Sequence, residues 1–360
     1  MKIEPIAYLE WAKFPGEIRI NLSRSGLPDL SLSELPVKLE TKDLDISGAN
    51  PYGYQPLIEA IANRYSVSPE EVIPTQGASQ AIFMTCGILL NSGDKVAVEK
   101  PAYEPLLRCP QLLGARVVRL ERRLENGYRI DLDDYRKVLN EGAKLVILTN
   151  LHNPTGVWLM KEEINLLARE AEKVGAYLFL DEIYLEFLSG AASQSAFGLN
   201  DRVIVASSLT KVYGLGGLRC GWVLAPKKIA KSFRRLMDYL IVEGVFIGEK
   251  IASLVFPYLD EIRAKSLPVI ERNRQLLIEF ISSEEKLRWV APAGGVVCFP
   301  RLVAGGNGDE FSFQLLSEAG IRVVPGSFFE APAHFRLGYA VPTETLRQAL
   351  EAMHSLLTRW

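Results

Sequence analysis

The sequence predicts an α/β fold whose mostly parallel sheet is covered by helices on both faces. From about Leu57 to Ala225, short apolar segments typical of strands alternate with amphipathic segments typical of helices. Strands separated in this way pair in parallel, because each helix returns the chain to the same edge of the sheet. After Ala225 the alternation stops, and long helical stretches precede a mixed segment. We therefore expect a second, smaller α+β domain.

The expected elements of the alternating region follow from the spacing of apolar residues and from residues that favour the ends of helices and strands. Apolar residues at helical spacing mark helices at 56–65, 78–90, 104–114, 131–140 and 161–175. Acids open the fourth helix and Gly175 closes the fifth, as the helix dipole and the left-handed end conformation favour. Short aliphatic runs mark strands at 95–101, 115–120, 144–150, 177–183, 202–209 and 220–225.

The C-terminal region reads differently. Helices are expected from Lys227 to about Glu285, then at 311–320 and 345–360. Strands are expected at 287–292, 296–300, 321–326 and 334–340. A chain of 360 residues exceeds one typical domain. We predict a large domain at 41–260 and a small domain formed by 1–40 and 261–360.

Composition excludes several classes of protein. Hydrophobic residues make up 48% and charged residues 23% of the chain, which is ordinary for a globular protein. A net charge of −2 argues against nucleic acid as a partner. The N-terminus lacks the apolar core of a signal peptide, and no apolar run is long enough to span a bilayer. The four cysteines are widely spaced, which argues against a metal or a disulfide framework. We expect a cytoplasmic protein with reduced, mostly buried thiols and no bound metal.

Polar residues follow three of the expected strands. Asn150 to Asn153, Asp181 to Tyr184 and Ser207 to Lys211 each lie at or just beyond a strand's carboxyl end. In open parallel sheets, ligands bind in the crevice at this edge. The chain topology should therefore bring the three segments together.

The segment from Ser207 to Gly221 carries the most information. It combines hydroxyls, one lysine, a glycine-rich turn and one arginine. A desolvated amine with a lowered pKa can form an imine with an aldehyde, and hydroxyls with an arginine suit a phosphate. A lysine near glycines is, by itself, more often a solvated loop residue. The full string resembles the pyridoxal-phosphate (PLP) attachment motif of class I/II aminotransferases, with Ser208 three residues before Lys211 and Arg219 eight residues after it.

This resemblance implies PLP-transferase fold type I, with a seven-stranded sheet, and a Schiff base between Lys211 and the cofactor. Cys220 departs from the motif, which usually has an aliphatic residue or alanine there. The resemblance also implies that Asn153 and Tyr184 contact the phenolic oxygen of the cofactor and that Asp181 pairs with the pyridine nitrogen. Alone, each is as readily a turn or cap residue, but their joint order and the 28-residue spacing from Asn153 to Asp181 (181 − 153) match the family.

Further roles come from the same resemblance. Tyr103 would stack on the cofactor ring, and Arg336, in an expected strand, would bind the substrate's α-carboxylate. The phosphate would be held at an expected helix N-terminus, which suits anions, and its ligands would be Ala78, Ser79, Ser208 and Arg219. Taken singly, these residues are as readily packing or surface residues.

Other positions match less well. Many family members carry, five residues before the position of Gly53, a tyrosine that reaches the partner subunit, but this chain has Gly48 there. Tyr52 and Tyr54 are the two candidates to replace it from a shifted loop, and the sequence assigns the role to neither. Gly26 is a weak match to a glycine near the substrate. His152 more often packs than catalyses.

The resemblance implies a PLP-dependent aminotransferase that moves an amino group between an amino acid and a 2-oxo acid, and a homodimer. A PLP-dependent lyase or decarboxylase on the same fold, of the C–S lyase or amino-acid-phosphate decarboxylase type, is the alternative. A PLP-binding regulator is disfavoured, since no basic DNA-binding segment is present. The side chain of the substrate stays open, because nothing selects Arg108 or Arg19 as a second cation.

Overall fold

The largest sheet of the molecule has seven strands. The structure is a computed structural model that describes residues 3–14, 16–188, 195–303 and 305–360. In spatial order the strands are β2 (Val72–Thr75), β8 (Gly221–Leu224), β7 (Val203–Ser208), β6 (Tyr177–Asp181), β5 (Ala143–Thr149), β3 (Lys95–Lys100) and β4 (Arg116–Glu121). The pairs from β7 to β4 are parallel, whereas β8 is antiparallel to both of its neighbours. The mostly parallel sheet predicted from the sequence is confirmed.

The edge strand β2 is the one element of this sheet that the sequence analysis missed. It has four residues, and Pro74 lies within it. Proline cannot donate to a ladder and is tolerated mainly at sheet edges, so this segment gives no strand pattern. Its pairing with β8 places Thr75, and the helix that follows, beside Gly221.

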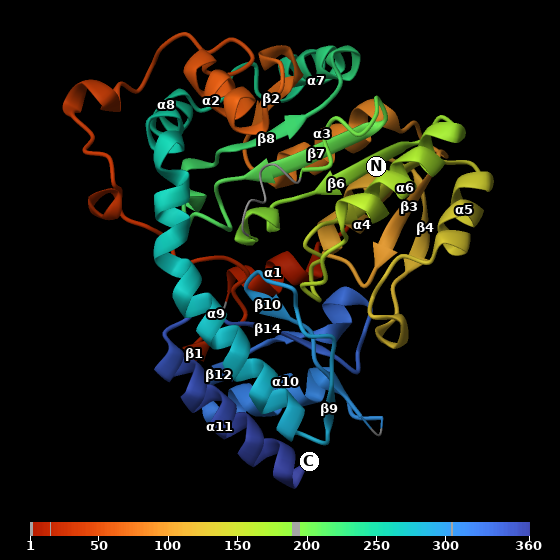
Figure 1. The fold of residues 1–360 in the computed structure, drawn as a ribbon, viewed down its shortest axis with the longest axis vertical. Coiled ribbons are helices and arrows are strands. Elements are labelled where there is room, and N and C mark those ends of the chain that lie inside the picture. The colour runs from red at the N-terminus through yellow and green to blue at the C-terminus, as the bar shows by residue number, and fades with distance from the viewer. Residues whose placement is uncertain (1–2, 15, 189–194, 304) are drawn as a thin grey trace.

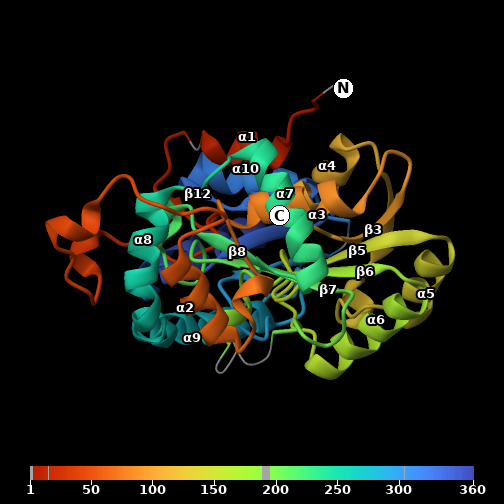
Figure 2. The same ribbon diagram turned by 90° about the horizontal axis from the view of Figure 1, so that it is seen from above.

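Helices cover both faces of the sheet (Figure 2). On one face lie α3 (Ala78–Leu89), α4 (Glu104–Leu112) and α7 (Lys227–Leu240), and on the other lie α2 (Gln55–Tyr65), α5 (Leu132–Asn140) and α6 (Lys161–Lys173). Successive residues of β5 point to opposite sides, with Ile147 in one apolar core and Val146 and Leu148 in the other. All five helices expected in the alternating region are confirmed.

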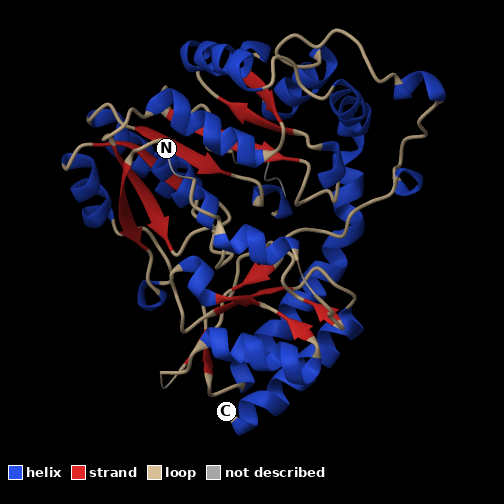
Figure 3. Cartoon of the chain, turned by 180° about the vertical axis from the view of Figure 1, so that it is seen from behind, coloured by secondary structure: helices blue, strands red, loops and turns tan. Residues whose placement is uncertain are grey.

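A second set of short strands lies below the large sheet (Figures 1 and 3). Here β14 (Phe335–Gly338) lies between β10 (Val297–Cys298) and β13 (Val324–Pro325), while β9 (Leu287–Arg288) pairs with β11 (Arg301–Leu302). The N-terminal strand β1 (Ile20–Asn21) pairs with β12 (Ile321–Arg322), so the first residues of the chain join this region. Helices α10 (Gly308–Ala319) and α11 (Thr343–Arg359) pack alongside, and the domain boundaries stay a prediction.

Two long connections complete the fold. After α8 (Phe246–Val255), the helix α9 (Leu259–Ser283) runs from the level of the large sheet to the short strands (Figure 1). Between β1 and α2, residues 28–50 form an outlying arm with two single turns, η1 (Leu32–Glu34) and η2 (Thr41–Leu44). No helix in the described ranges has the length and apolar character needed to cross a membrane.

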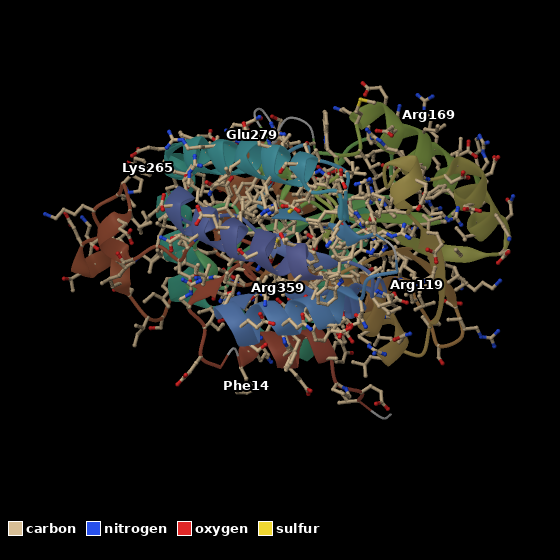
Figure 4. The ribbon with its side chains drawn as sticks, turned by 90° about the horizontal axis from the view of Figure 1, so that it is seen from below. Phe14, Arg119, Arg169, Lys265, Glu279 and Arg359 are labelled. Atoms are coloured by element: carbon tan, nitrogen blue, oxygen red, sulfur yellow. The ribbon has the colours of Figure 1, made fainter. Side chains whose placement is uncertain are left out.

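A short N-terminal helix, α1 (Ala7–Lys13), lies between the large sheet and the short strands (Figure 1). It has seven residues and no side-chain cap, so it could not be stable alone. Tertiary contacts hold it: the Tyr8 amide donates to Glu104 Oε2 at 2.8 Å, and the Tyr8 ring lies among Tyr103, Phe328 and Phe329. The helix ends beside Phe14, whose side chain is exposed at the rim of the molecule (Figure 4).

Candidate active site

Strand register gathers the polar segments at one edge of the sheet. Thr149 is paired with Asp181 across β5 and β6, and Ser208 with Gly221 across β7 and β8. The three segments that follow strands in the sequence therefore meet, as the topology argument predicted. A cavity of about 280 Å³ opens at this edge, between the sheet and α1.

The cavity contains most of the residues singled out in the sequence. Eight of the ten line it: Ala78, Ser79, Tyr103, Asn153, Asp181, Tyr184, Lys211 and Arg219. The other two lie behind the lining. Ser208 is buried and its Oγ accepts the Thr210 amide at 3.2 Å, and Arg336 Nη1 donates to Asn153 Oδ1 at 3.0 Å.

Lys211 follows β7 and turns into the cavity. Burial lowers the pKa of its amine, although the nearby Tyr8 and Asp181 oppose this effect. The backbone of Gly26 lies directly against it: a Cβ on Gly26 would be 3.0 Å from Lys211 Cδ, and the Leu27 amide donates to the Lys211 carbonyl at 2.9 Å. The weak sequence match at Gly26 thus corresponds to a close approach that a larger residue would disturb.

Asp181 is a buried carboxyl group at the end of β6, only 4% exposed. Among the described residues, its carboxylate accepts a hydrogen bond from the Ile183 amide at 3.2 Å, and no cationic side chain forms an ion pair with it. Burial raises the pKa of Asp181 to about 7. An unpaired carboxylate is costly at such a depth, so the site is suited to a ligand that brings a positive charge or an N–H donor.

The opposite end of the cavity is suited to an anion. Gly77, with φ +82°, precedes α3, and no side chain caps the helix, so the first-turn amides are free of a side-chain partner. Arg219 Nη2 donates to the Gln76 carbonyl at 2.9 Å, and a Cβ on Gly77 would come within 2.7 Å of the same nitrogen. A Cβ on Gly221 would lie 2.7 Å from Gly77 Cα. The two glycines allow the arginine and the helix N-terminus to meet.

Two tyrosines contribute hydroxyls to the lining. Burial raises the pKa of both Tyr103 and Tyr184, so each stays a neutral phenol that can donate. The Tyr103 ring makes an edge contact with Tyr8, at 5.7 Å between centroids.

A fully buried charged network lies behind the site, and the sequence analysis did not find it. Glu99 Oε2 accepts Arg122 Nη1 at 2.6 Å, and Glu99 Oε1 accepts both the amide and the hydroxyl of Thr149. Thr149 Oγ1 in turn accepts the Asn153 amide at 3.1 Å. The network thereby fixes the loop that carries Asn153. His152 is also buried, packed between the Pro101 carbonyl and Thr155.

Other lining residues were also missed. Tyr8, Leu9 and Ala12 come from α1, and Ser25 precedes Gly26. Their segments are near the N-terminus, far in sequence from the strand ends, and carry no spacing relation to them. Only the aromatic and apolar pattern of residues 7–13 hinted at a packed segment.

The tyrosines near Gly53 lie away from the cavity. Tyr52 Oη donates to Asp238 at 3.3 Å and the Tyr54 ring packs on Phe246, with 5.4 Å between centroids. Neither lines the cavity of its own chain. The four cysteines are free thiols, of which Cys86, Cys220 and Cys298 are buried, as expected.

The sheet order and the two-part architecture are those of PLP-transferase fold type I. Comparison with known families matches residues 18–353 to the model of "Aminotransferase class I and II". The chain belongs to this family.

Similarity to individual proteins extends over nearly the whole chain. A capreomycidine synthase of Streptomyces vinaceus is 30% identical over 351 residues, covering 94% of this chain and 89% of that protein. The arginine–pyruvate transaminase AruH of Pseudomonas aeruginosa is 28% identical over 361 residues, covering 96% and 91%.

Solved structures agree. A PLP-dependent aminotransferase from Streptococcus suis superposes with a TM-score of 0.92 at 28% identity, covering all of this chain and 99% of that one. The PLP-dependent cyclase OrfR superposes with a TM-score of 0.89 at 28% identity, covering 100% of this chain and 98% of that one.

Proposed function

We propose that this protein is a PLP-dependent aminotransferase that moves an amino group between an amino acid and a 2-oxo acid, with Lys211 as the amine that holds the cofactor. One observation carries the proposal. In a chain of the aminotransferase family, Lys211, Asp181, Asn153 and Arg219 converge on a single 280 Å³ cavity from separate segments.

The residues present fit PLP. The buried carboxyl group of Asp181, which has no cationic partner among the described residues, suits a protonated ring nitrogen. The uncapped N-terminus of α3 with Arg219 suits the phosphate. Asn153, Tyr184 and Tyr103 line the space between these two ends, and Ser208 lies behind it.

PLP, when bound, supplies an aldehyde that takes up the amino group and a ring that accepts the electrons left when the α-proton departs. The protein's part is to position groups and move protons. Because burial lowers the pKa of Lys211, its Nζ is more readily neutral and can take and return the α-proton. Asp181 would pair with the ring nitrogen of bound PLP and hold it in its protonated form.

The guanidinium of Arg336 suits the α-carboxylate of an amino acid, which it can bind bidentately. It is fully buried beside Asn153, at the side of the cavity closed by α1. Amino acids and 2-oxo acids both carry such a carboxylate, and simple amines do not.

We also propose a homodimer. Tyr239 is 87% and Ile46 82% exposed, and their segments lie side by side because Lys250 Nζ binds Asp45 Oδ2 at 2.9 Å and Pro51 bridges Glu243. The same segments also expose Leu44, Leu240, Val242 and Val245. Monomeric proteins rarely expose a large contiguous apolar patch. Tyr52 lies in the same region, bonded to Asp238, where it is placed to reach a second copy.

The half-reaction tests the proposal. Purified holoenzyme mixed with one L-amino acid and no acceptor should convert its cofactor absorbance to that of the amine form, and pyruvate or 2-oxoglutarate should reverse the change. L-arginine, L-aspartate and L-alanine are suitable first donors. Lys211→Ala should slow the half-reaction by at least about 10³-fold, whereas Lys231→Ala, an exposed lysine on α7, should not. Equal rates in the two variants would contradict the proposal.

A second candidate is a PLP-dependent cyclase, lyase or decarboxylase. Among these three, the similarity to a capreomycidine synthase and to a PLP-dependent cyclase favours the cyclase. The same experiment separates the candidates. A cyclase or lyase would consume its amino acid catalytically without an acceptor and leave the cofactor in its aldehyde form.

A further inference from the structure

Tyr8 both lines the cavity and contacts Arg336 through its hydroxyl. Arg336 is fully buried and does not line the cavity itself. Its Nη1 donates to Asn153 Oδ1 at 3.0 Å, and its Nη2 donates to Tyr8 Oη and to the Ser23 carbonyl, both at 2.9 Å. Asn153 and Tyr8 line the cavity. The polar groups next to Arg336 that a ligand in the cavity meets are therefore an amide and a phenol.

The position of the Tyr8 hydroxyl is fixed from several sides. The Tyr8 amide donates to Glu104 Oε2 at 2.8 Å, and Glu104 Oε1 also accepts Arg108 Nε at 2.9 Å, so the start of α1 is tied to α4. The Tyr8 ring makes edge contacts with Tyr103 at 5.7 Å and Phe328 at 5.9 Å. A hydroxyl held in this way loses little further freedom when it binds a ligand.

The hydroxyl proton of Tyr8 is available to donate a further hydrogen bond. A guanidinium has no acceptor, so the oxygen of Tyr8 accepts from Arg336 and its own O–H proton stays available. Within the described part of the chain, this hydroxyl makes no other hydrogen bond. Burial raises the pKa of Tyr8, but Arg336, Lys211 and Arg322 together outweigh burial, and the net pKa is lowered. The phenol is therefore a stronger donor than an ordinary tyrosine.

We propose that Tyr8 is a substrate-binding residue whose hydroxyl donates a hydrogen bond to the substrate's α-carboxylate, so that Tyr8 and Arg336 bind this group together. The inference rests on the proposed function, and it assigns to α1 a direct part in selecting amino acids over amines. A carboxylate in the cavity beside Tyr8 would accept a hydrogen bond from the phenol, and the positive charge of Arg336 behind the phenol would strengthen the attraction.

Two small ligands test this assignment. 2-Aminoisobutyrate has an α-carboxylate but no α-hydrogen, so it can bind without being turned over, and its methyl groups make few demands on side-chain specificity. Isopropylamine lacks the carboxylate. The dissociation constant of each is measured from the change in cofactor absorbance on titration of holoenzyme, for wild type, Tyr8→Phe and Tyr135→Phe. The last variant removes a buried hydroxyl that donates to the Leu167 carbonyl, away from the cavity.

Tyr8→Phe keeps the ring contacts and removes only the hydroxyl. We expect it to weaken 2-aminoisobutyrate about tenfold, because bonds to charged groups are the strong ones, and to leave isopropylamine unchanged. Tyr135→Phe should change neither. An unchanged constant for 2-aminoisobutyrate, or an equal loss for both ligands, overturns the role of Tyr8. A wild type that responds to neither ligand nor to any amino donor refutes the proposed function itself.

Discussion

Burial changes the ionisation of individual side chains at this site. Asp181 and Lys211 face one cavity, and burial raises the pKa of the first and lowers the pKa of the second, so the neutral form of each is more populated than it would be in water. A cationic ring beside Asp181 would favour the ionised carboxylate there. The sequence identified both residues through their motif, but it gave no measure of burial, and burial decides the charge.

The carboxyl group of Asp181 makes the stability of the cofactor-free protein depend on pH. Its pKa is about 7 when folded and near 4 when unfolded, so the folded state binds more protons between these values and stability falls as pH rises through this window. Asp181→Asn removes the effect. We expect the variant to gain about 5 °C in Tm relative to wild type between pH 5 and pH 8, by calorimetry of the apoprotein.

Two controls accompany this measurement. The variant Asp201→Asn changes an exposed aspartate and should show the same pH dependence as wild type. Glu182 is also buried with a raised pKa, but it is present in every variant, so its contribution cancels in the comparison. Adding PLP should reverse the order, since only wild type pairs with the ring. A difference between Asp181→Asn and wild type that is the same at both pH values would refute the assignment.

Secondary-structure elements were predictable where they are long and periodic. The helices and parallel strands of the alternating region were all found from their apolar spacing. Strand β2 and helix α1 were missed because each is short and is held by distant partners, β8 and Glu104 respectively. The buried ion pair of Glu99 and Arg122, which joins the ends of β3 and β4, was missed for a similar reason. Nothing in the sequence distinguishes these two residues from charged residues on the surface.

The buried pair of Glu99 and Arg122 is expected to contribute to stability. Glu99→Gln leaves Arg122 buried without its counter-charge and should cost about 3 kcal/mol. Adding Arg122→Met should recover part of this loss, because the unpaired charge is gone. The measurement is the urea midpoint of each variant. Equal midpoints for the single and double variants would show that the charge of Arg122 is not what makes Glu99 necessary.

At the scale of the whole molecule, the fold brings an exposed apolar region together from two parts of the chain. Residues 42–52 lie against residues 238–250, and the large apolar side chains there face outward. The outlying arm at 28–50 extends from the same side in Figure 1. Such a surface is suited to a second copy of the chain, which the sequence suggested only through its family.

Light scattering after size exclusion tests the dimer. We expect wild type to have twice the chain mass at micromolar concentration, and Tyr239→Lys to shift the population toward the monomer by placing a charge in an apolar contact. Phe313→Lys, which changes a 70% exposed aromatic residue on α10, is the matched control and should stay dimeric. A wild type of single-chain mass would contradict the proposal.

The sequence by itself determined the class of fold and the family, and it singled out the residues proposed to carry the chemistry, because strand and helix periods and the order of Asn153, Asp181, Lys211 and Arg219 are local patterns along the chain. Only the tertiary structure decided which distant groups complete the cavity. Tyr8 meets Arg336 across 328 residues, and Glu99 supports Asn153 through Thr149. Contacts of this kind depend on how helices and sheets pack, and packing leaves no period in the sequence.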